Sequence, residues 1–89
     1  MHIRNRQDLG AFLQKLRERE AITQSDVASA CGVTLQFVSK IERGDSLIPV
    51  NKIRKYAKAI GIGSLQLFEL RDQVRSSEDK AEFMKGGAR

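Results

Sequence analysis

The chain has 89 residues, of which 40% are hydrophobic and 30% charged, and its 16 Lys and Arg residues against 11 Asp and Glu residues give a net charge of +5. A chain of this length forms one small domain and is too short for two independent cores, while its composition is typical of a globular protein. Its apolar stretches are too short to cross a membrane, and residues 1–8 lack the apolar segment of a signal peptide, so we expect a cytoplasmic location.

Residue types that build catalytic or metal sites are scarce in this sequence. The single cysteine, Cys31, can form no internal disulfide, and together with the single histidine, His2, it cannot complete a zinc site. Gly61 and Gly63 follow an expected helix instead of a strand, which is the wrong setting for a phosphate loop, and no Ser, His and acid set can converge. The sequence therefore predicts a protein that is not an enzyme and needs no cofactor or metal. We interpret Cys31 as a small core residue, with a redox-sensing thiol as the alternative.

The excess positive charge is concentrated in the middle of the chain. Residues 34–58 carry six basic and two acidic side chains, whereas residues 69–89 carry five of each. A partner with a polyanionic surface would favour this distribution. A solvated basic face is the alternative, and charge alone does not distinguish the two.

Apolar residues recur at helical intervals instead of alternating, which predicts an all-α protein. The first helix is expected over residues 6–20, with Asn5 as its N-cap. Its apolar stripe consists of Leu9, Phe12, Leu13 and Leu16.

The second helix is expected to begin directly after Thr23. The Thr23 hydroxyl can accept a hydrogen bond from the amide three residues on, and Asp26 is favoured at the positive end of a helix. Gly32 supplies the left-handed conformation that ends this helix, and only two residues later Thr34 can cap the next one. Two short helices thus meet across a tight turn, and the second helix buries Val27, Ala28 and Cys31.

The third helix is expected over residues 35–43 and closes at Gly44. Val38 and Ile41 form its inward face. Phe37 lies at the boundary of that face, and two placements are open: outward, or packed on the following helix.

Two further helices are expected. Pro49 suits the first turn of the fourth, which ends at Gly61. Ser64 can cap a fifth segment, for which we favour a helix, although Leu65 and Leu67 also alternate with polar residues as in a strand. From residue 76 the sequence is polar, so we expect a domain over residues 1–75 followed by a mobile tail over residues 76–89. The apolar stripe of the fourth helix is Ile53, Tyr56, Ala57 and Ile60.

The helix, glycine turn and helix of residues 24–43 satisfy the spacing of a helix-turn-helix at several independent positions. The segments LREREAITQSDVASACGV, FVSKIERG and KYAKAIGI resemble the Cro and phage-repressor type of helix-turn-helix proteins, also called the XRE family. The resemblance runs over residues 9–70, about two-thirds of the chain. It implies a compact five-helix DNA-binding domain similar to that of lambda repressor, acting as a sequence-specific transcriptional regulator, with repression as the expected outcome.

The resemblance also implies that the helix after Thr34 enters the major groove of a double-stranded DNA operator. Gln36 can then make a paired contact to adenine, Lys40 can donate to guanine, and Leu35 can press on a thymine methyl group. For a single surface Gln or Lys a solvated side chain is the plain alternative. The expected base-reading residues are Leu35, Gln36, Ser39 and Lys40.

Contacts to phosphates are expected to flank this helix, because sequence-neutral anchoring fixes its register on the duplex. Arg17 and Glu42 occupy positions where the family has a structural ion pair between the first and third helices. We expect a homodimer on a nearly palindromic operator, since one short helix contacts few bases. The expected phosphate-binding residues are Gln24, Thr34, Arg43, Asn51 and Lys52.

A second resemblance leaves an alternative function open. The segment IRNRQDLGAFLQKLRERE and the short chain are similar to antitoxins of the HipB kind, whose dimer binds an operator and also holds a toxin kinase. In that group a terminal strand follows the fourth helix, and the segment GSLQLFELR could supply it. The alternative to a plain regulator is therefore an antitoxin with a toxin protein as its partner.

Overall fold

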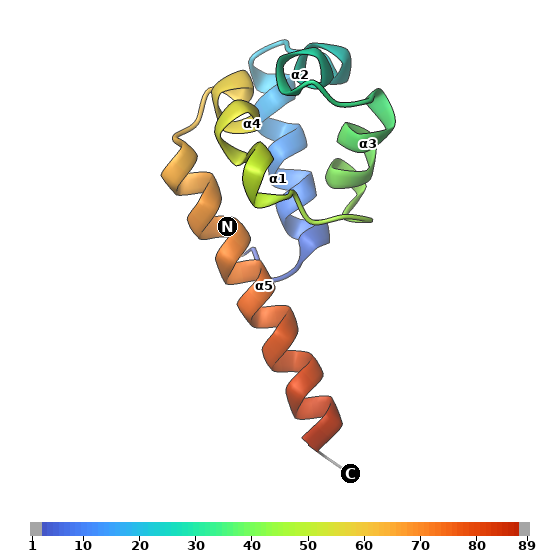
Figure 1. The fold of residues 1–89 in the computed structure, drawn as a ribbon, viewed down its shortest axis with the longest axis vertical. Helices are drawn as coiled ribbons and strands as arrows, with labels where there is room; N and C mark the ends of the chain where they lie inside the picture. The colour runs from blue at the N-terminus through green and yellow to red at the C-terminus, as the bar shows by residue number, and fades with distance from the viewer. Residues whose placement is uncertain (1–2, 88–89) are drawn as a thin grey trace.

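The computed structural model describes the backbone of residues 3–87 and the side chains of residues 3–80, so His2 lies outside the described residues. Five α-helices and one 3-10 turn account for its regular structure, and residues 3–87 contain no strand, which confirms the all-α prediction. The first four helices form a compact group, and the fifth runs out of it (Figure 1). In chain order the elements are α1 (Arg6–Arg19), α2 (Gln24–Cys31), α3 (Leu35–Arg43), η1 (Val50–Lys52), α4 (Ile53–Ile60) and α5 (Ser64–Gly87).

The starts of the first three helices are capped by the residues that the sequence predicts. Asn5 accepts from the amide of Asp8 at 2.8 Å, and Thr34 accepts from an amide of α3. At α2, Thr23 and Asp26 exchange two hydrogen bonds, the side chain of each accepting from the backbone amide of the other. This capping box satisfies two amides that would otherwise lack partners at a helix start.

Glycines in the left-handed conformation end α2 and α3. Gly32 has φ 65° and Gly44 has φ 77°, values that a residue with a Cβ atom adopts only with strain. The turn between α2 and α3 is therefore as short as the sequence predicts, and α3 is bounded at both ends.

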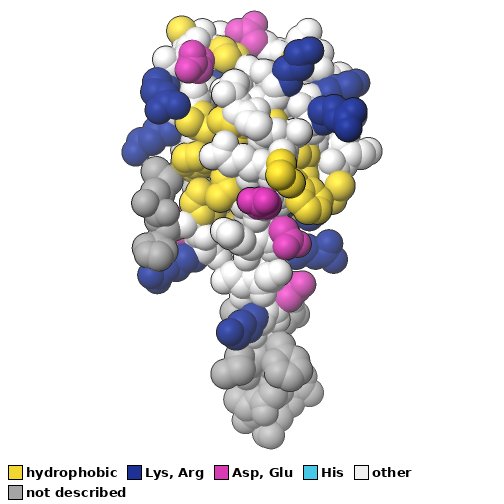
Figure 2. All heavy atoms as spheres, turned by 90° about the vertical axis from the view of Figure 1, so that its left-hand side faces the viewer, with side chains coloured by type: hydrophobic (Ala, Val, Ile, Leu, Met, Phe, Trp, Pro, Cys, Tyr) yellow, Lys and Arg dark blue, Asp and Glu magenta, His cyan; other side chains and the backbone are white. Residues whose placement is uncertain are grey.

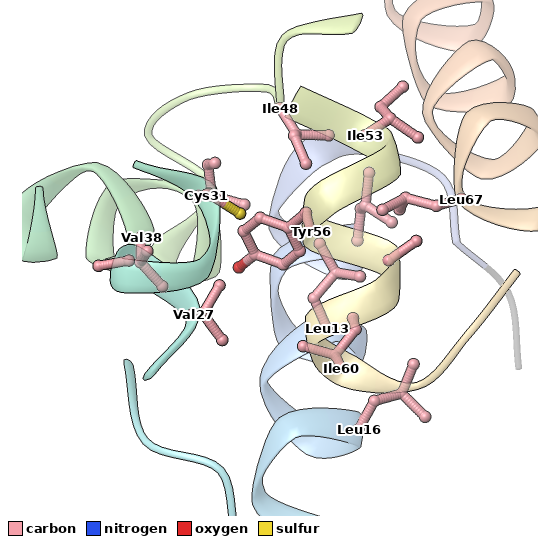
Figure 3. Packing of buried hydrophobic residues seen from close by; sticks show 14 of the residues in the cluster. Leu13, Leu16, Val27, Cys31, Val38, Ile48, Ile53, Tyr56, Ile60 and Leu67 are labelled. Carbon is pink, nitrogen blue, oxygen red and sulfur yellow. The ribbon is translucent and has the colours of Figure 1, made fainter. Parts of the chain in front are cut away.

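One core joins all five helices, with Tyr56 of α4 at its centre (Figure 3). Leu13 comes from α1, Val27 from α2 and Leu67 from α5, and each of these side chains is fully buried. Burying such side chains stabilises a small domain by about 1.5 to 3 kcal/mol each. The remaining buried apolar residues are Leu9, Leu16, Ala28, Cys31, Val38, Ile41, Ile48, Ile53, Ala57, Ile60 and Val74.

A close approach of α1 to the end of α3 depends on Gly10. A Cβ atom at this position would overlap the carbonyl oxygens of Ile41 and Glu42, which are backbone atoms with little freedom to move. Gly10 therefore allows α1 to lie directly against α3. Sequence periodicity gives no sign of this contact, because the partner atoms lie about thirty residues away.

The segment before α4 differs from the prediction. Pro49 lies ahead of the 3-10 turn η1 and not in the first turn of α4, which begins at Ile53. Ile48, which directly precedes Pro49, is fully buried, and its carbonyl accepts from Arg71 of α5. The buried side chain of Ile48 and the hydrogen bond from Arg71 therefore hold the loop between α3 and α4 against the domain.

The fifth segment is a helix and not the alternative strand, and it crosses the predicted domain boundary at residue 75 without interruption. Leu67 and Val74 are buried against the other helices. Beyond the predicted boundary, Glu78 accepts from the backbone amide of Arg6 at 3.1 Å and from its guanidinium Nη2 at 2.7 Å. The helix is therefore attached to the start of α1 at a point that the sequence assigned to the tail.

No helix within the described residues is long and apolar enough to cross a membrane.

Candidate nucleic-acid interface

The outward face of α3 presents three of the four residues expected to read bases. Leu35 is 44% exposed, and Gln36 and Lys40 are also exposed, whereas Val38 and Ile41 are buried. Phe37 is half-buried and packs against the core, which favours a packed placement over an outward one. An exposed leucine beside an amide and an ammonium group gives this face both polar and apolar contact chemistry.

The fourth residue, Ser39, is half-buried and directed toward α2. Its hydroxyl donates to Oε1 of Gln24 at 3.0 Å, and Nε2 of Gln24 donates to Oε1 of Glu42 at 2.9 Å. The side chain of Gln24, where a phosphate contact is expected, thus links the start of α2 to two positions of α3.

Arg17 and Glu42 form an ion pair between α1 and α3. The guanidinium donates from Nε to Oε2 at 2.6 Å and from Nη2 to Oε1 at 3.0 Å, a two-bond geometry that is strong and directional. The Glu42 side chain is only 2% exposed, and its hydrogen bonds raise the pKa of Arg17 above its usual value. Arg17 also donates from Nη1 to the carbonyl of Ile22, so it holds the loop before α2 as well.

The groups expected to bind phosphates lie around α3, with different environments. Thr34 is exposed and caps α3, and Asn51 is exposed in η1. Arg43 is exposed and paired with Asp45 at 3.0 Å. Lys52 is half-buried, and its ammonium group lies 3.4 Å from the carbonyl oxygen of Cys31. Arg43 and Lys52 therefore have internal partners that compete with a phosphate.

A shallow hollow lies beside the start of α3. It is lined by the end of α1, the first residues of α2, and Leu35. The first-turn amides of α2 border this hollow, and helix N-termini of this kind attract anions.

A second exposed surface is apolar and lies away from α3. It combines Val50 of η1 with Leu65 and Phe68 of α5, which are 53%, 68% and 43% exposed. With Arg54 and Ser64 they line one shallow pocket. Figure 2 shows hydrophobic side chains gathered on this side of the molecule, with charged groups around them.

Cys31 is buried in the core. Burial raises the pKa of its thiol, an effect that nearby Lys52 and Lys55 oppose. A reactive thiol needs the opposite shift and solvent access, so this environment agrees with the interpretation of Cys31 as a core residue.

Comparison with known proteins agrees with the helix-turn-helix geometry. The family model described as Helix-turn-helix matches residues 13–68, and the chain belongs to this family, in its XRE-type branch.

Among curated relatives, HigA2 of Mycobacterium tuberculosis (strain ATCC 25618 / H37Rv), a putative antitoxin, is 40% identical over 60 residues, covering 65% of this chain and 59% of that protein. The uncharacterized HTH-type transcriptional regulator y4wC of Sinorhizobium fredii (strain NBRC 101917 / NGR234) is 28% identical over 74 residues, covering 82% of this chain and 52% of that regulator. The chain thus spans little more than half the length of these two relatives.

Among solved structures, the restriction-modification controller protein C.AhdI from Aeromonas hydrophila superimposes with a TM-score of 0.59 at 29% sequence identity. The match covers 65% of this chain and 88% of C.AhdI. The helical arrangement is therefore one that a known controller protein also adopts.

Proposed function

We propose that this protein is a sequence-specific, double-stranded DNA-binding transcriptional regulator that inserts α3 into the major groove as a homodimer. The observation that carries the proposal is the outward face of α3, where Leu35, Gln36 and Lys40 project together from a helix held rigidly behind. Membership of the helix-turn-helix family and the likeness to transcriptional regulators support it. A small domain that occupies an operator blocks other proteins from the same DNA, so we propose repression as the outcome.

The three exposed side chains suit different base edges. The Gln36 amide can pair with N6 and N7 of adenine, and the Lys40 ammonium can donate to O6 and N7 of guanine. Leu35 has the apolar surface to contact a thymine methyl group. We therefore assign base discrimination to these three residues.

Anchoring to the phosphates is assigned to the residues around α3. Arg43 and Lys52 supply positive charge when they exchange Asp45 and the Cys31 carbonyl for a phosphate. Asn51 supplies a neutral donor. The first-turn amides of α2 and α3, beside Gln24 and Thr34, supply further donors. These contacts hold α3 in register but carry no sequence information.

Association into a homodimer is assigned to the apolar surface of Val50, Leu65 and Phe68. Apolar side chains gathered on one side of a small domain indicate an interaction site. This surface contains no residue of α3, so a second copy can cover it and leave α3 open to DNA.

Selection of bound fragments from random duplex DNA, at a stated salt concentration, tests the activity. We expect enrichment of a nearly palindromic sequence whose half-sites lie about 34 Å apart, one turn of the double helix. Equal recovery of all fragments would contradict the proposal.

Substitutions separate the two kinds of contact. Gln36→Ala or Lys40→Ala should weaken binding to the selected site by about 1 to 3 kcal/mol and relax the preference at one base position. Lys52→Ala should weaken binding to every duplex alike, because it removes a phosphate contact. Uniform effects for all three variants would contradict the assignment of base readers.

Sedimentation of the free protein tests the association. We expect a dimer for the natural chain and a monomer for Phe68→Asp, since a carboxylate would then be desolvated in the interface. Ala11→Asp, at an exposed position of α1, controls for the change of charge. A natural chain that stays monomeric both free and on operator DNA would rule out the homodimer.

The similarity to HigA2 supports a second candidate function, an antitoxin that binds its own operator and neutralises a toxin partner such as a kinase. The two candidates share the DNA chemistry and differ in the partner protein. Co-purification with the product of a neighbouring toxin gene would favour the antitoxin. Selected operator DNA without such a gene or partner would favour the plain regulator.

A further inference from the structure

The direction of the Gln24 amide is fixed by the charge of Glu42. Nε2 of Gln24 lies 2.9 Å from a carboxylate oxygen that also accepts from Arg17, so the amide nitrogen and not the amide oxygen must face Glu42. The opposite orientation would place two oxygens with no proton between them. Oε1 of Gln24 is therefore directed to Ser39, whose hydroxyl has to act as the donor.

Gln24 is attached to α3 at two points. Ser39 and Glu42 are three residues apart, which places them on the same face of the helix about one turn from each other. Two contacts along one face, made by a single side chain from α2, resist rotation of α3 about its own axis. Arg17 holds the same carboxylate from α1, so three helices share this chain of hydrogen bonds.

Rotation of α3 is the motion to which base contacts are most sensitive. Side chains of an α-helix extend about 5 Å from its axis, so a rotation of about 10° displaces their ends by about 1 Å. A binding group has to be held within about 0.5 Å of its working position. Small rotations of α3 would therefore misplace Gln36 and Lys40 while leaving phosphate contacts at the helix ends nearly unchanged.

We propose that Gln24 and Ser39 are positioning residues that set the rotation of α3 and thereby determine sequence preference without contacting a base themselves. This inference rests on the proposed function. It gives Ser39 a positioning role in place of the expected base contact, and it adds a positioning role to the phosphate contact expected at Gln24. The hydroxyl proton of Ser39, and one N–H group and the oxygen of the Gln24 amide, are engaged inside the protein.

The test compares Ser39→Ala with the natural chain on the selected duplex and on a scrambled duplex at the same salt concentration. We expect the ratio of the two affinities to fall about fivefold, the equivalent of one lost hydrogen bond, with preference reduced at the bases read by both Gln36 and Lys40. Binding to scrambled duplex should stay the same. Ser39→Thr keeps the hydroxyl and should restore the ratio.

Ser29→Ala, the same chemical change at an exposed position of α2, is the matched control and should leave the ratio unchanged. Thermal unfolding of Ser39→Ala should remain cooperative. This result would show that the variant still folds and that the lower ratio comes from a misplaced α3. In a double-mutant cycle, Ser39→Ala and Gln36→Ala should have less than additive effects, because Gln36 is already misplaced in the first variant.

The outcomes distinguish this inference from the function on which it rests. A natural chain that binds both duplexes equally would overturn both. A selective natural chain with an unchanged ratio for Ser39→Ala would overturn only the positioning role. Loss of preference at one base position alone, with effects additive to those of Gln36→Ala, would return Ser39 to direct base contact.

Discussion

The helices α3 and α5 are held in place by different combinations of contacts. α3 has nine residues, a cap at its start, a left-handed glycine at its end, and directional hydrogen bonds from both α1 and α2. α5 has 24 residues and buries Leu67 and Val74 against the domain, and Arg71 and Glu78 add polar contacts to Ile48 and Arg6. It leaves two large apolar side chains uncovered near its start. The two helices lie on opposite sides of α1 (Figure 1).

This difference matches the tasks that we propose for the two regions. Base recognition depends on orientation, which hydrogen bonds of fixed geometry control well. Association depends on apolar area, which needs exposure more than angular accuracy. Substitutions in each region should therefore affect different properties.

The largest expected effect concerns the attachment of α3. Glu42→Ala leaves the Arg17 guanidinium buried without its carboxylate and should lower the free energy of unfolding by about 4 kcal/mol, measured by urea denaturation. Glu69→Ala, the same change at an exposed position of α5, should alter it by less than about 0.5 kcal/mol. If Glu42→Ala does not fold, the double variant Arg17→Met/Glu42→Leu should recover stability, since it leaves no charge unpaired. Failure of that recovery would contradict a buried pair.

The next effect concerns the attachment of α5. Leu67→Ala creates a cavity between α5 and the domain and should lower the free energy of unfolding by about 3 kcal/mol. Leu65→Ala, on the exposed side of the same helix, should have little effect on the monomer. Similar losses for both variants, measured at concentrations where the protein is monomeric, would show that Leu65 is covered within the chain.

A smaller effect, of opposite sign, is expected at the centre of the core. The hydroxyl of Tyr56 is buried and has no hydrogen-bond partner among the described residues, and burial raises its pKa. In Figure 3 it points toward the side of the core formed by Val27 and Val38. Tyr56→Phe removes this unsatisfied group and should raise the free energy of unfolding by about 1 kcal/mol. A loss of stability would instead indicate a buried water bound to the hydroxyl.

The smallest effect concerns the far attachment of α5, through Glu78 and Arg6. Hydrogen bonds from Arg6 lower the pKa of Glu78, so the stabilisation is present above the unfolded-state pKa of about 4.3 and is lost as pH falls through the lower folded-state value. The pair is partly exposed, so Glu78→Gln should cost less than about 1 kcal/mol at pH 7, measured by thermal unfolding. The difference between the variant and the natural chain should shrink below about pH 4. A difference that persists at low pH would contradict an ionic origin.

Local signals in the sequence were sufficient to locate the helix-turn-helix. Thr23 and Thr34 act on amides three residues away, and Gly32 and Gly44 act on their own backbone, so each helix boundary depends only on its neighbours. The pairing of Arg17 with Glu42 came from the family resemblance, and their distance in this chain agrees with it.

Contacts between different helices could not be predicted from these local signals. The contact at Gly10 and the partners of Gln24 involve residues far apart in the chain, and nothing in their own segments points to them. The course of α5 past residue 75 was missed because a polar segment gives no apolar stripe. In the structure, the hydrogen bonds from Arg6 to Glu78 hold this polar part of the helix to the start of α1.

A nine-residue helix is too short to persist by itself in water, where about 12 to 15 residues are needed even for favourable sequences. A synthetic peptide copied from α3 should therefore be unstructured and should not reproduce the DNA preference of the intact chain. Under the proposed function, we expect that transplanting the preference to a related domain needs the exposed positions Leu35, Gln36 and Lys40, provided that the recipient keeps its own equivalents of Gln24, Ser39 and Glu42 beneath them.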